Sequence, residues 1–171
     1  MHLRPIRATL AIAVVLASAG AADPRVTLGG EARASVTAFL DGRAIPLVDV
    51  GRHYCDDLSF PVITCSLNAA SINARASASL SASLSAAAVT YVTIYDAAGY
   101  GGAFLHVSQD YTGLSFIGWN DRISSFKARN SETGRFWTDW FYSGTTWSFC
   151  CNQQLASLGG YDNTFSSVER T

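Results

Sequence analysis

The feature that most constrains this chain is an internal repeat in its C-terminal half. A constant shift of 42 residues brings residues of the same special types into register. The matched positions are Tyr95 with Trp137, Tyr100 with Tyr142, Gly102 with Gly144, Gly118 with Gly160, Trp119 with Tyr161, Asn120-Asp121 with Asp162-Asn163, and Ser124-Ser125 with Ser166-Ser167. Chance matching of this kind is improbable, so the two copies are predicted to fold as two versions of one supersecondary unit.

Short runs of β-branched and aromatic residues follow one another from Val89 to Thr171, separated by glycine and by Asn or Asp. This pattern is typical of antiparallel strands joined by tight turns. Each copy has room for four short strands, as in a Greek-key motif. We therefore predict an all-β sandwich of two Greek keys, at residues 89–130 and 131–171, packed as a pair of sheets.

Each copy opens with an aromatic residue, four further residues, a second aromatic residue, one residue and a glycine. In the first copy these are Tyr95, Tyr100 and Gly102. An aromatic ring packed under a folded hairpin can lock it, and glycine supplies a backbone angle that other residues resist. The motif thus predicts one locked hairpin in each copy.

Each copy ends with a polar hexapeptide, Asn120-Asp-Arg-Ile-Ser-Ser125 and Asp162-Asn-Thr-Phe-Ser-Ser167. Asn and Asp favour turns, and with serine hydroxyls and loop carbonyls they offer an all-oxygen environment that suits a hard cation such as calcium. Ile123 and Phe165 stand at matching positions between the polar groups. We expect these two apolar side chains to anchor the loops in the core.

In these two motifs the chain resembles the βγ-crystallin family. Both copies fit its aromatic-x-x-x-x-aromatic-x-Gly signature and its Asn/Asp-Asn/Asp-x-x-Ser/Thr-Ser calcium motif, and the match covers about half of the chain. The resemblance implies a βγ-crystallin-like domain over residues 89–171. It also implies two calcium ions, held by two polar loops that lie side by side, with each ion taking ligands from both copies.

The resemblance assigns the ligands by position. Asp121 and Asn163 would give side-chain oxygens, Ser124 and Ser166 hydroxyls, and Arg122 and Thr164 main-chain carbonyls. The full set of candidate metal residues is Asp96, Asn120, Asp121, Arg122, Ser124, Asp139, Asp162, Asn163, Thr164 and Ser166. Asp96 fits the family pattern directly, whereas Asp139 stands two residues after Trp137. By the same resemblance, Ser125 and Ser167 tie the hairpins and are not ligands.

The N-terminus predicts export. Two arginines precede an apolar run from Ala8 to Ala19, small residues continue to Ala22, and the first acidic residue is Asp23. This is the pattern of a secretory signal peptide, at residues 1–22. The apolar run is about half the length that spans a bilayer, so a secreted protein without a membrane anchor is expected after cleavage.

Export would place Cys55, Cys65, Cys150 and Cys151 where disulfides persist. A bond between the neighbours Cys150 and Cys151 is disfavoured by their short Cα separation. The short loop from Cys55 to Cys65 is favoured and would contribute roughly 2–3 kcal/mol. Pairing of the N-terminal segment with Cys150 or Cys151 stays open at this point.

The region before the repeat carries no functional motif. Residues 23–65 contain scattered apolar positions between glycine breaks, which predicts a small irregular segment of unknown role. Residues 66–88 are almost entirely Ser, Ala and Leu. Alanine favours a helix and Leu80 and Leu84 lie four apart, but the many serines and the alternating pattern suit a linker or an extended strand equally well. We predict a linker with an optional short helix.

Composition and motifs narrow the function. The formal net charge is −1 and only 15% of the residues are charged, so the composition shows no excess of basic residues that would bind the phosphates of a nucleic acid. The chain has no nucleophile elbow, zinc-histidine motif or phosphate loop, so no enzyme is predicted, and His53 and His106 are expected to be ordinary surface or hairpin histidines. We expect calcium to stabilise the fold of a non-catalytic protein that has an extracellular or cell-surface partner.

Two alternatives keep the crystallin fold and change the role. A secreted protease inhibitor or killer toxin-like protein would need an exposed rigid loop, for which the segment from Ser143 to Gly160 is a candidate. That segment is also predicted, with preference, to form core strands of the second Greek key. A surface interaction module could use the aromatic residues Trp137, Trp140 and Phe141.

Overall fold

The computed structural model describes residues 35–82 and 89–171. The predicted signal peptide and the first residues of the segment after it lie outside this range. Among the described residues, none of the helices is both long and apolar enough to cross a membrane.

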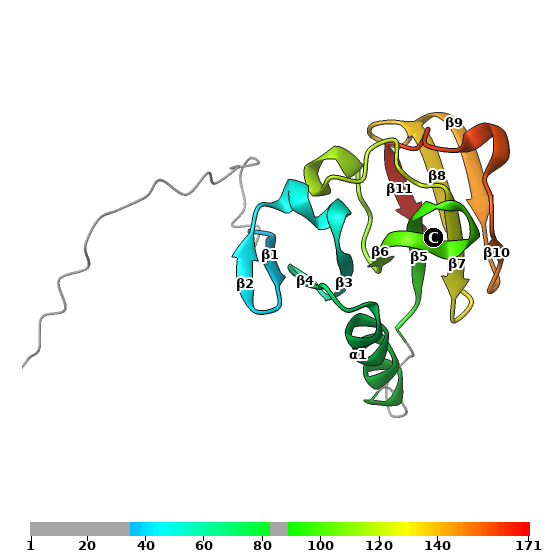
Figure 1. Ribbon diagram of the computed structural model, residues 1–171. Coiled ribbons are helices and arrows are strands. Elements are labelled where there is room, and N and C mark those ends of the chain that lie inside the picture. Colours follow the sequence, from blue (N-terminus) through cyan, green and yellow to red (C-terminus); the bar gives the residue numbers. More distant parts are fainter. Residues whose placement is uncertain (1–34, 83–88) are drawn as a thin grey trace, which may run out of the picture. The chain divides into compact units, whose positions relative to one another are not determined.

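The elements follow one another as strands and short helices (Figure 1). The strands are β1 (Thr37–Leu40), β2 (Arg43–Ile45), β3 (Tyr54–Ser59), β4 (Val62–Ser66), β5 (Tyr91–Ala97), β6 (Gly101–Val107), β7 (Ser125–Arg129), β8 (Gly134–Asp139), β9 (Ser143–Phe149), β10 (Gln154–Leu155) and β11 (Ser167–Arg170). The helices are α1 (Ala69–Ala82) and the 3₁₀ turns η1 (Leu47–Arg52), η3 (Ala98–Tyr100), η4 (Leu114–Ile117) and η5 (Gly159–Tyr161).

The strands form two sheets. The larger has the order β10-β7-β5-β6-β3-β4-β1-β2, and the smaller has the order β11-β8-β9. The two repeat copies exchange strands between the sheets, because β10 of the second copy pairs with β7 and Tyr111 of the first copy bridges to Val168 of β11. The predicted all-β sandwich of two Greek keys is confirmed.

A core of aromatic rings fills the space between the two sheets. Phe136 lies at its centre, with ring centroids 4.8 Å from Phe149 and 5.3 Å from both Phe126 and Phe165. Trp119 is also fully buried. Rings that meet edge-on or tilted in this way add stability beyond the apolar area that they bury.

The expectation of a small irregular segment before the repeat is wrong for residues 37–66, which form β1 to β4. Strand β3 pairs in parallel with β6 and so extends the sheet of the first Greek key. The sequence did not predict this strand because it is covered on both faces. Cys55, Asp56 and Asp57 are all buried, so the alternation of apolar and polar residues that marks a half-exposed strand is missing.

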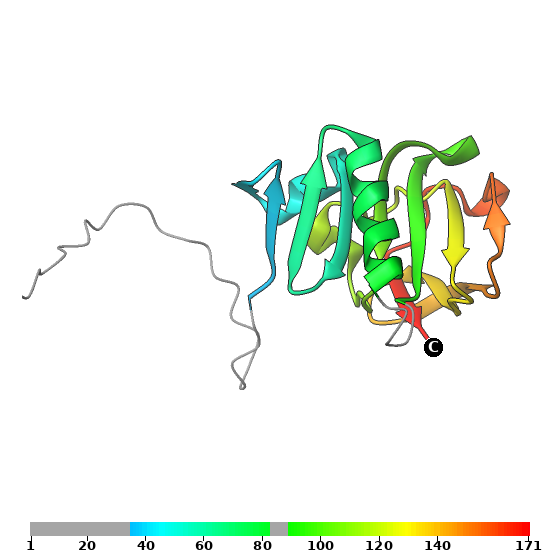
Figure 2. The same ribbon diagram turned by 90° about the horizontal axis from the view of Figure 1, so that it is seen from below.

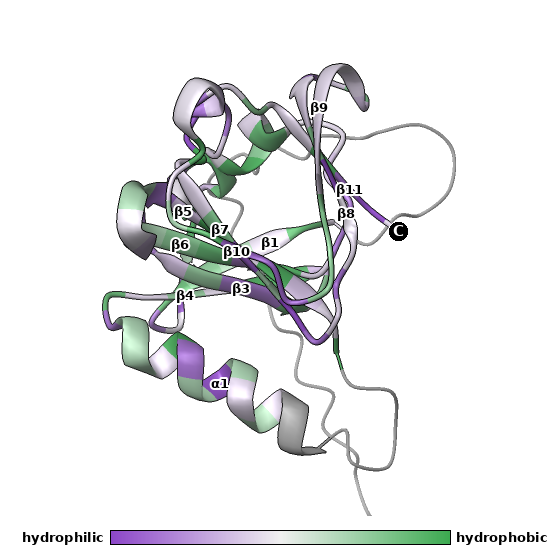
Figure 3. Ribbon diagram, turned by 90° about the vertical axis from the view of Figure 1, so that its right-hand side faces the viewer, coloured by the Kyte–Doolittle hydropathy of each residue, from purple (hydrophilic) through white to green (hydrophobic). Residues whose placement is uncertain are grey.

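In the Ser/Ala-rich stretch, Ala69–Ala82 form the helix α1, and residues 83–88 lie outside the described range. Helix α1 joins β4 to β5 across the sheet and lies on the face opposite the smaller sheet (Figures 2 and 3). Its buried residues Ile72 and Ala76 lie one turn apart, and Ile72 packs in a cluster with Tyr95 and Phe104. Arg75 adds an ion pair of 2.9 Å to the buried carboxylate of Asp56. Tertiary contacts therefore hold a helix whose own sequence is only weakly amphipathic.

The favoured disulfide pairing is the one found. Cys55 and Cys65 face each other across the β3–β4 hairpin, and their sulfur atoms are 2.09 Å apart. Cys150 and Cys151 are exposed free thiols.

A buried carboxylate joins the added strand β3 to the Greek-key domain. Asp57 is fully buried, and its carboxylate accepts hydrogen bonds from the main-chain N–H of Ser108 at 2.6 Å and from the hydroxyl of Tyr111 at 2.9 Å. Burial raises the pKa of Asp57 from its ordinary 3.8 to about 6, although the two hydrogen bonds act in the opposite direction. The fold therefore holds this proton more tightly than the unfolded chain does.

This difference predicts a pH dependence. Between about pH 4 and pH 6 the folded state holds a proton on Asp57 that the unfolded state releases, so the contribution of Asp57 to the free energy of unfolding falls as the pH rises through this window. The lowered pKa of His106 acts with the opposite sign in the same window, so the effect of Asp57 is the difference between wild type and variant. We expect Asp57 to account for a loss of roughly 2–3 kcal/mol. In Asp57→Asn this contribution should vanish. Denaturant unfolding of both proteins at pH 4, 5, 6 and 7 would measure the difference in the free energy of unfolding. The surface variant Asp49→Asn should keep the wild-type slope, and equal slopes in wild type and Asp57→Asn would contradict the prediction.

Candidate metal centre

The two polar loops lie side by side and hold each other. The main-chain N–H of Asp121 donates to the carbonyl of Phe165, and that of Asn163 donates to the carbonyl of Ile123, each at 3.0 Å. Ile123 and Phe165 are fully buried, as expected of anchors. Asp121 and Asn163 both have positive φ angles, 52° and 56°, so the two loops repeat the same backbone turn.

Three oxygen atoms from three segments meet at Ser124. Its hydroxyl lies 3.3 Å from the side-chain oxygen of Asn163, in the other loop, and 3.3 Å from the main-chain oxygen of Asp96, at the end of β5. We call this group clamp A. It contains a hydroxyl, an amide oxygen and a carbonyl, and none of these three groups carries a charge.

The second loop repeats the arrangement. The hydroxyl of Ser166 lies 3.4 Å from a carboxylate oxygen of Asp121, again across the two loops, and we call this pair clamp B. The two serines are placed alike, because the N–H of Ser124 donates to Tyr95 at 2.9 Å and that of Ser166 donates to Trp137 at 2.8 Å. Both serines are buried, 4% and 5% exposed. Clamp B differs from clamp A in having a carboxylate.

The remaining candidate residues of the loops surround the clamps. The side-chain amide of Asn120 donates to Asp121 at 2.6 Å, and the amide of Asn163 donates to Asp162 at 3.3 Å. Asn120 and Asp162 therefore orient the neighbouring clamp residue. The hydroxyl of Thr164 donates to the carbonyl of Tyr161 at 2.8 Å, which closes the turn of the second loop.

Arg122 sets the electrostatics beside clamp A. Its guanidinium pairs with the carboxylate of Asp96 at 2.9 Å and also donates to the carbonyl of Gly118 at 3.2 Å. The side chain of Asp96 is thus engaged by Arg122, while its main-chain oxygen belongs to clamp A. A cation in clamp A would have this guanidinium as a neighbour.

Two serines tie the hairpins, as the resemblance implied. The hydroxyl of Ser125 donates to the carbonyl of Ala97 at 2.7 Å and accepts from the N–H of Tyr100 at 3.1 Å. Ser167 repeats both bonds, to the carbonyl of Asp139 at 2.6 Å and from the N–H of Tyr142 at 3.2 Å. Asp139 thus takes the place of Ala97 in the second copy, and its main-chain oxygen serves the hairpin tie.

The glycines of the hairpin motif are required by close contacts. Gly102 has a φ of +71°, and a Cβ at this position would lie 1.8 Å from a carboxylate oxygen of Asp96. Gly144 has a φ of +80°, and its Cβ would lie 2.5 Å from a carboxylate oxygen of Asp139. Both hairpins therefore fold onto an aspartate that only glycine leaves room for.

The donors of the two clamps are oxygen atoms only. Within residues 35–82 and 89–171, no group of three or more His, Cys, Asp or Glu could hold a metal ion. A metal here would have to be bound by hydroxyl, amide, carboxylate and carbonyl oxygens, which is the ligand set of a hard cation such as calcium and not that of zinc. The chemistry of the clamps therefore fits calcium.

Half of the segment proposed as an inhibitory loop, from Ser143 to Gly160, is strand, in β9 and β10. The preferred prediction of core strands holds only in part: Phe149 is buried and Trp147 packs on Tyr161 with ring centroids 5.2 Å apart, but most residues of β9 are exposed. Of the aromatic residues expected to be available for contacts, Trp140 and Phe141 are 40% and 68% exposed. Phe116 joins them, with its ring centroid 5.3 Å from that of Trp140. The sequence did not indicate Phe116, because it belongs to a short 3₁₀ turn outside both motifs.

Comparison with known proteins gives the following. No protein-family model matches the chain, and no curated protein matches it either. Among solved structures, an archaeal βγ-crystallin is similar at 28% identity over 48% of this chain and 99% of its own, with a TM-score of 0.44. A βγ-crystallin from Ciona intestinalis is 23% identical over 47% and 98%, with a TM-score of 0.43. A βγ-crystallin domain from Clostridium beijerinckii is 24% identical over 47% and 95%, with a TM-score of 0.42.

The C-terminal half of this chain has a βγ-crystallin-like fold of two Greek keys. Its two motifs, their hairpin ties and the exchange of strands between the sheets are all in place. Strands β1 to β4 continue the larger sheet beyond β6, and α1 packs on its outer face through Ile72.

Proposed function

We propose that the βγ-crystallin domain binds two calcium ions, one in each clamp, and that calcium stabilises the fold of a secreted, non-catalytic protein. The observation that carries the proposal is the pairing of oxygens across the two loops, Ser124 with Asn163 and Ser166 with Asp121. A cation shared by both loops would hold together segments that are 39 and 45 residues apart in the chain. Stabilisation follows because the unfolded chain cannot bring these oxygens together.

The low charge of the clamps sets the expected affinity. With a dissociation constant of about 0.1–1 mM, as in extracellular calcium modules, and free calcium of about 1 mM, each site contributes roughly 0.4–1.4 kcal/mol. Clamp B should bind more tightly, because Asp121 supplies a carboxylate. Clamp A offers the amide of Asn163 and lies beside the guanidinium of Arg122.

The test is a thermal melt with chelator and with about 1 mM calcium, and with magnesium as the comparison ion. Calcium should raise the melting temperature by several degrees, given roughly 2–4 °C per kcal/mol for a chain of this size. The double variant Ser124→Arg and Ser166→Arg should lose the rise, because each arginine puts a positive charge in a clamp.

The controls separate binding from folding. Ser71→Arg changes an exposed serine of α1 in the same way and should keep the full calcium response. Of the two single variants, Ser166→Arg should remove the tighter step in isothermal titration. A wild-type protein that shows neither calcium heat nor a change in melting temperature would refute the proposal.

Secretion is the second part of the proposal. The signal-peptide pattern of residues 1–22 supports it, and so does the Cys55–Cys65 pair at disulfide distance, which suits an oxidising compartment. The exposed rings of Phe116, Trp140 and Phe141 are the surface that we propose for an extracellular or cell-surface partner. Recovery of the processed protein from the culture medium, with its N-terminus read by mass spectrometry, would test export.

A further inference from the structure

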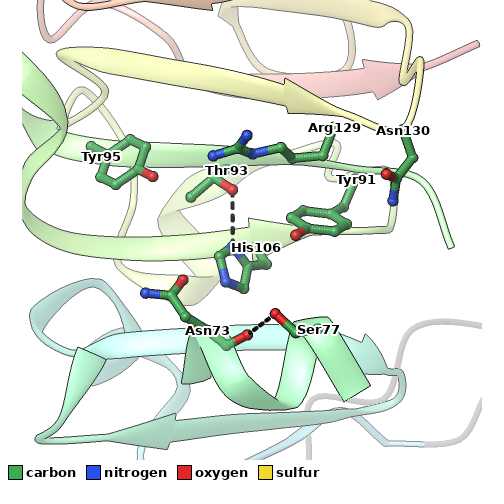
Figure 4. Close-up of a pocket in the computed structure, with 8 residues that line it drawn as sticks. All are labelled: Asn73, Ser77, Tyr91, Thr93, Tyr95, His106, Arg129 and Asn130. Atoms are coloured by element: carbon green, nitrogen blue, oxygen red, sulfur yellow. Dashed lines mark hydrogen bonds between the residues drawn. The ribbon is translucent and has the colours of Figure 1, made fainter. Parts of the chain in front are cut away.

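A cavity of about 310 Å³ lies between α1 and the outer face of the larger sheet (Figure 4). Side chains of α1, β5, β6 and β7 and of the residue after β7 line it. They are Asn73, Ser77, Tyr91, Thr93, Tyr95, His106, Arg129 and Asn130. The cavity exists because the β4–α1–β5 connection carries a helix over this face, so it belongs to the added layer and to the first Greek key together.

His106 brings an unpartnered polar atom to this cavity. The expectation of an ordinary surface or hairpin histidine is wrong, since the side chain is buried on β6 and the residue is only 3% exposed. Nδ1 lies 2.9 Å from the hydroxyl of Thr93, while Nε2 has no hydrogen-bond partner in the described part of the chain. A buried polar atom left in this state costs about 1–3 kcal/mol. It therefore points to a ligand.

The charge and the tautomer of His106 decide how Nε2 can bind a ligand. Burial, with a contribution from the charge of Arg129, lowers the pKa of His106 to about 4, so the imidazole is neutral at physiological pH. The bond between Nδ1 and the Thr93 hydroxyl can run in either direction, depending on the ring tautomer. In the tautomer where the hydroxyl donates, the ring hydrogen sits on Nε2, which can then donate to an acceptor on the ligand.

The charge of the residues that line the cavity also favours a ligand with acceptor oxygens. Arg129 supplies a guanidinium, and no carboxylate is among the lining residues. Across the described residues Arg129 forms no ion pair. An arginine without a carboxylate partner matches an oxyanion, to which it can donate two parallel hydrogen bonds.

Aromatic rings provide the apolar walls. Tyr91 and Tyr95 are 7% and 9% exposed, and the ring centroid of Tyr91 lies 5.0 Å from that of His106. Their hydroxyls and the amide of Asn73 add polar groups around the same space (Figure 4). A volume at the lower end of the range for ligand pockets fits a molecule of about one ring.

We infer that this cavity binds a small ring-containing molecule that carries an oxyanion. The guanidinium of Arg129 pairs with the oxyanion, Nε2–H of His106 donates a hydrogen bond to the ligand, and Tyr91 and Tyr95 contact its ring. A carboxylate and a phosphate monoester share this chemistry. The inference is independent of calcium, because neither clamp takes a side-chain ligand from the residues that line the cavity.

The experiment follows the histidine side-chain NMR signals during titration of the full mature chain in chelator. The probes are benzoate, phenyl phosphate and the uncharged analogue benzyl alcohol. At least one of the two anions should shift the His106 signal saturably, while the signal of His53 stays in place. Benzyl alcohol should bind at least about tenfold more weakly, since it cannot pair with the guanidinium.

Variants decide the role of the guanidinium. Arg129→Gln should weaken anion binding at least about tenfold, and Arg129→Lys should recover part of the loss. Arg135→Gln removes an arginine from β8 in the other sheet and should leave binding unchanged. If benzoate gives the stronger response, the oxyanion is a carboxylate, and if phenyl phosphate does, it is a phosphate monoester. Both results support the inference. A folded wild type that responds to neither anion would overturn it, as would binding that benzyl alcohol matches or that Arg129→Gln retains.

Discussion

Replacement of Arg170 by alanine is expected to lower the free energy of unfolding by about 3–5 kcal/mol, the cost of leaving a buried carboxylate without its partner. The guanidinium donates to both carboxylate oxygens of Glu132, at 3.1 Å and 2.7 Å, and Glu132 is only 3% exposed. It also donates to the carbonyl and the hydroxyl of Thr90, each at 3.0 Å, and to the carbonyl of Ser108. One side chain on β11 therefore holds together Thr90 and Ser108 of the first Greek key and Glu132 at the start of the second.

Denaturant unfolding of the single and double variants would measure this effect. Arg170→Met with Glu132→Leu should recover most of the loss, because the pair then leaves no buried charge behind. The control is Arg135→Ala, which breaks a 3.9 Å pair to Glu169 whose two side chains are 49% and 32% exposed. Its expected cost is below about 1 kcal/mol. If Arg170→Ala costs no more than Arg135→Ala, the ion pair does not hold these segments.

Arg170 also illustrates why part of the fold could not be predicted. Its partners Thr90 and Ser108 are 80 and 62 residues away, and no local pattern encodes such a contact. The same holds for Asp57, whose partners Ser108 and Tyr111 are 51 and 54 residues away. A strand with buried aspartates lacks the apolar–polar alternation of a strand, so the sequence does not predict β3.

The two Greek keys were predictable because both copies of the repeat carry the same residue types at the positions where the hairpin and the loop require them. Each hairpin needs a glycine at one position and a tying serine at another, and each loop needs an apolar anchor between polar residues. Gly102 with Gly144 and Ser125 with Ser167 meet these requirements at identical spacing. Such requirements are local, and a local requirement leaves a trace in the sequence.

The candidate site was predictable only in its outline. The motif indicated which side chains belong to the loops, but not that Arg122 pairs with Asp96 or that Asp139 serves the hairpin of the second copy. Both contacts depend on how the hairpin folds over the loop. The cavity at His106 was not predicted at all, because α1 creates it and the sequence predicts α1 only as an optional short helix within a linker.

Phe165→Ala is expected to cost about 3–5 kcal/mol, the range for removing a fully buried phenylalanine ring. Phe165 is fully buried, with ring centroids 5.3 Å from Phe136 and 5.8 Å from Tyr161. Its truncation would leave a cavity between the two sheets, beneath the second polar loop. Denaturant unfolding in chelator would measure the loss.

The same substitution should also weaken calcium binding, because Phe165 lies between Asn163 and Ser166, and its carbonyl accepts the N–H of Asp121. A loop that loses its anchor presents residues of both clamps less firmly, so the calcium-dependent rise in melting temperature should shrink. Phe165→Leu keeps most of the volume and should cost less than about 1.5 kcal/mol, with the calcium response retained. If Phe165→Ala lost stability but kept the full calcium response, the buried ring would support the core alone, and the loops would hold their geometry through their reciprocal main-chain bonds.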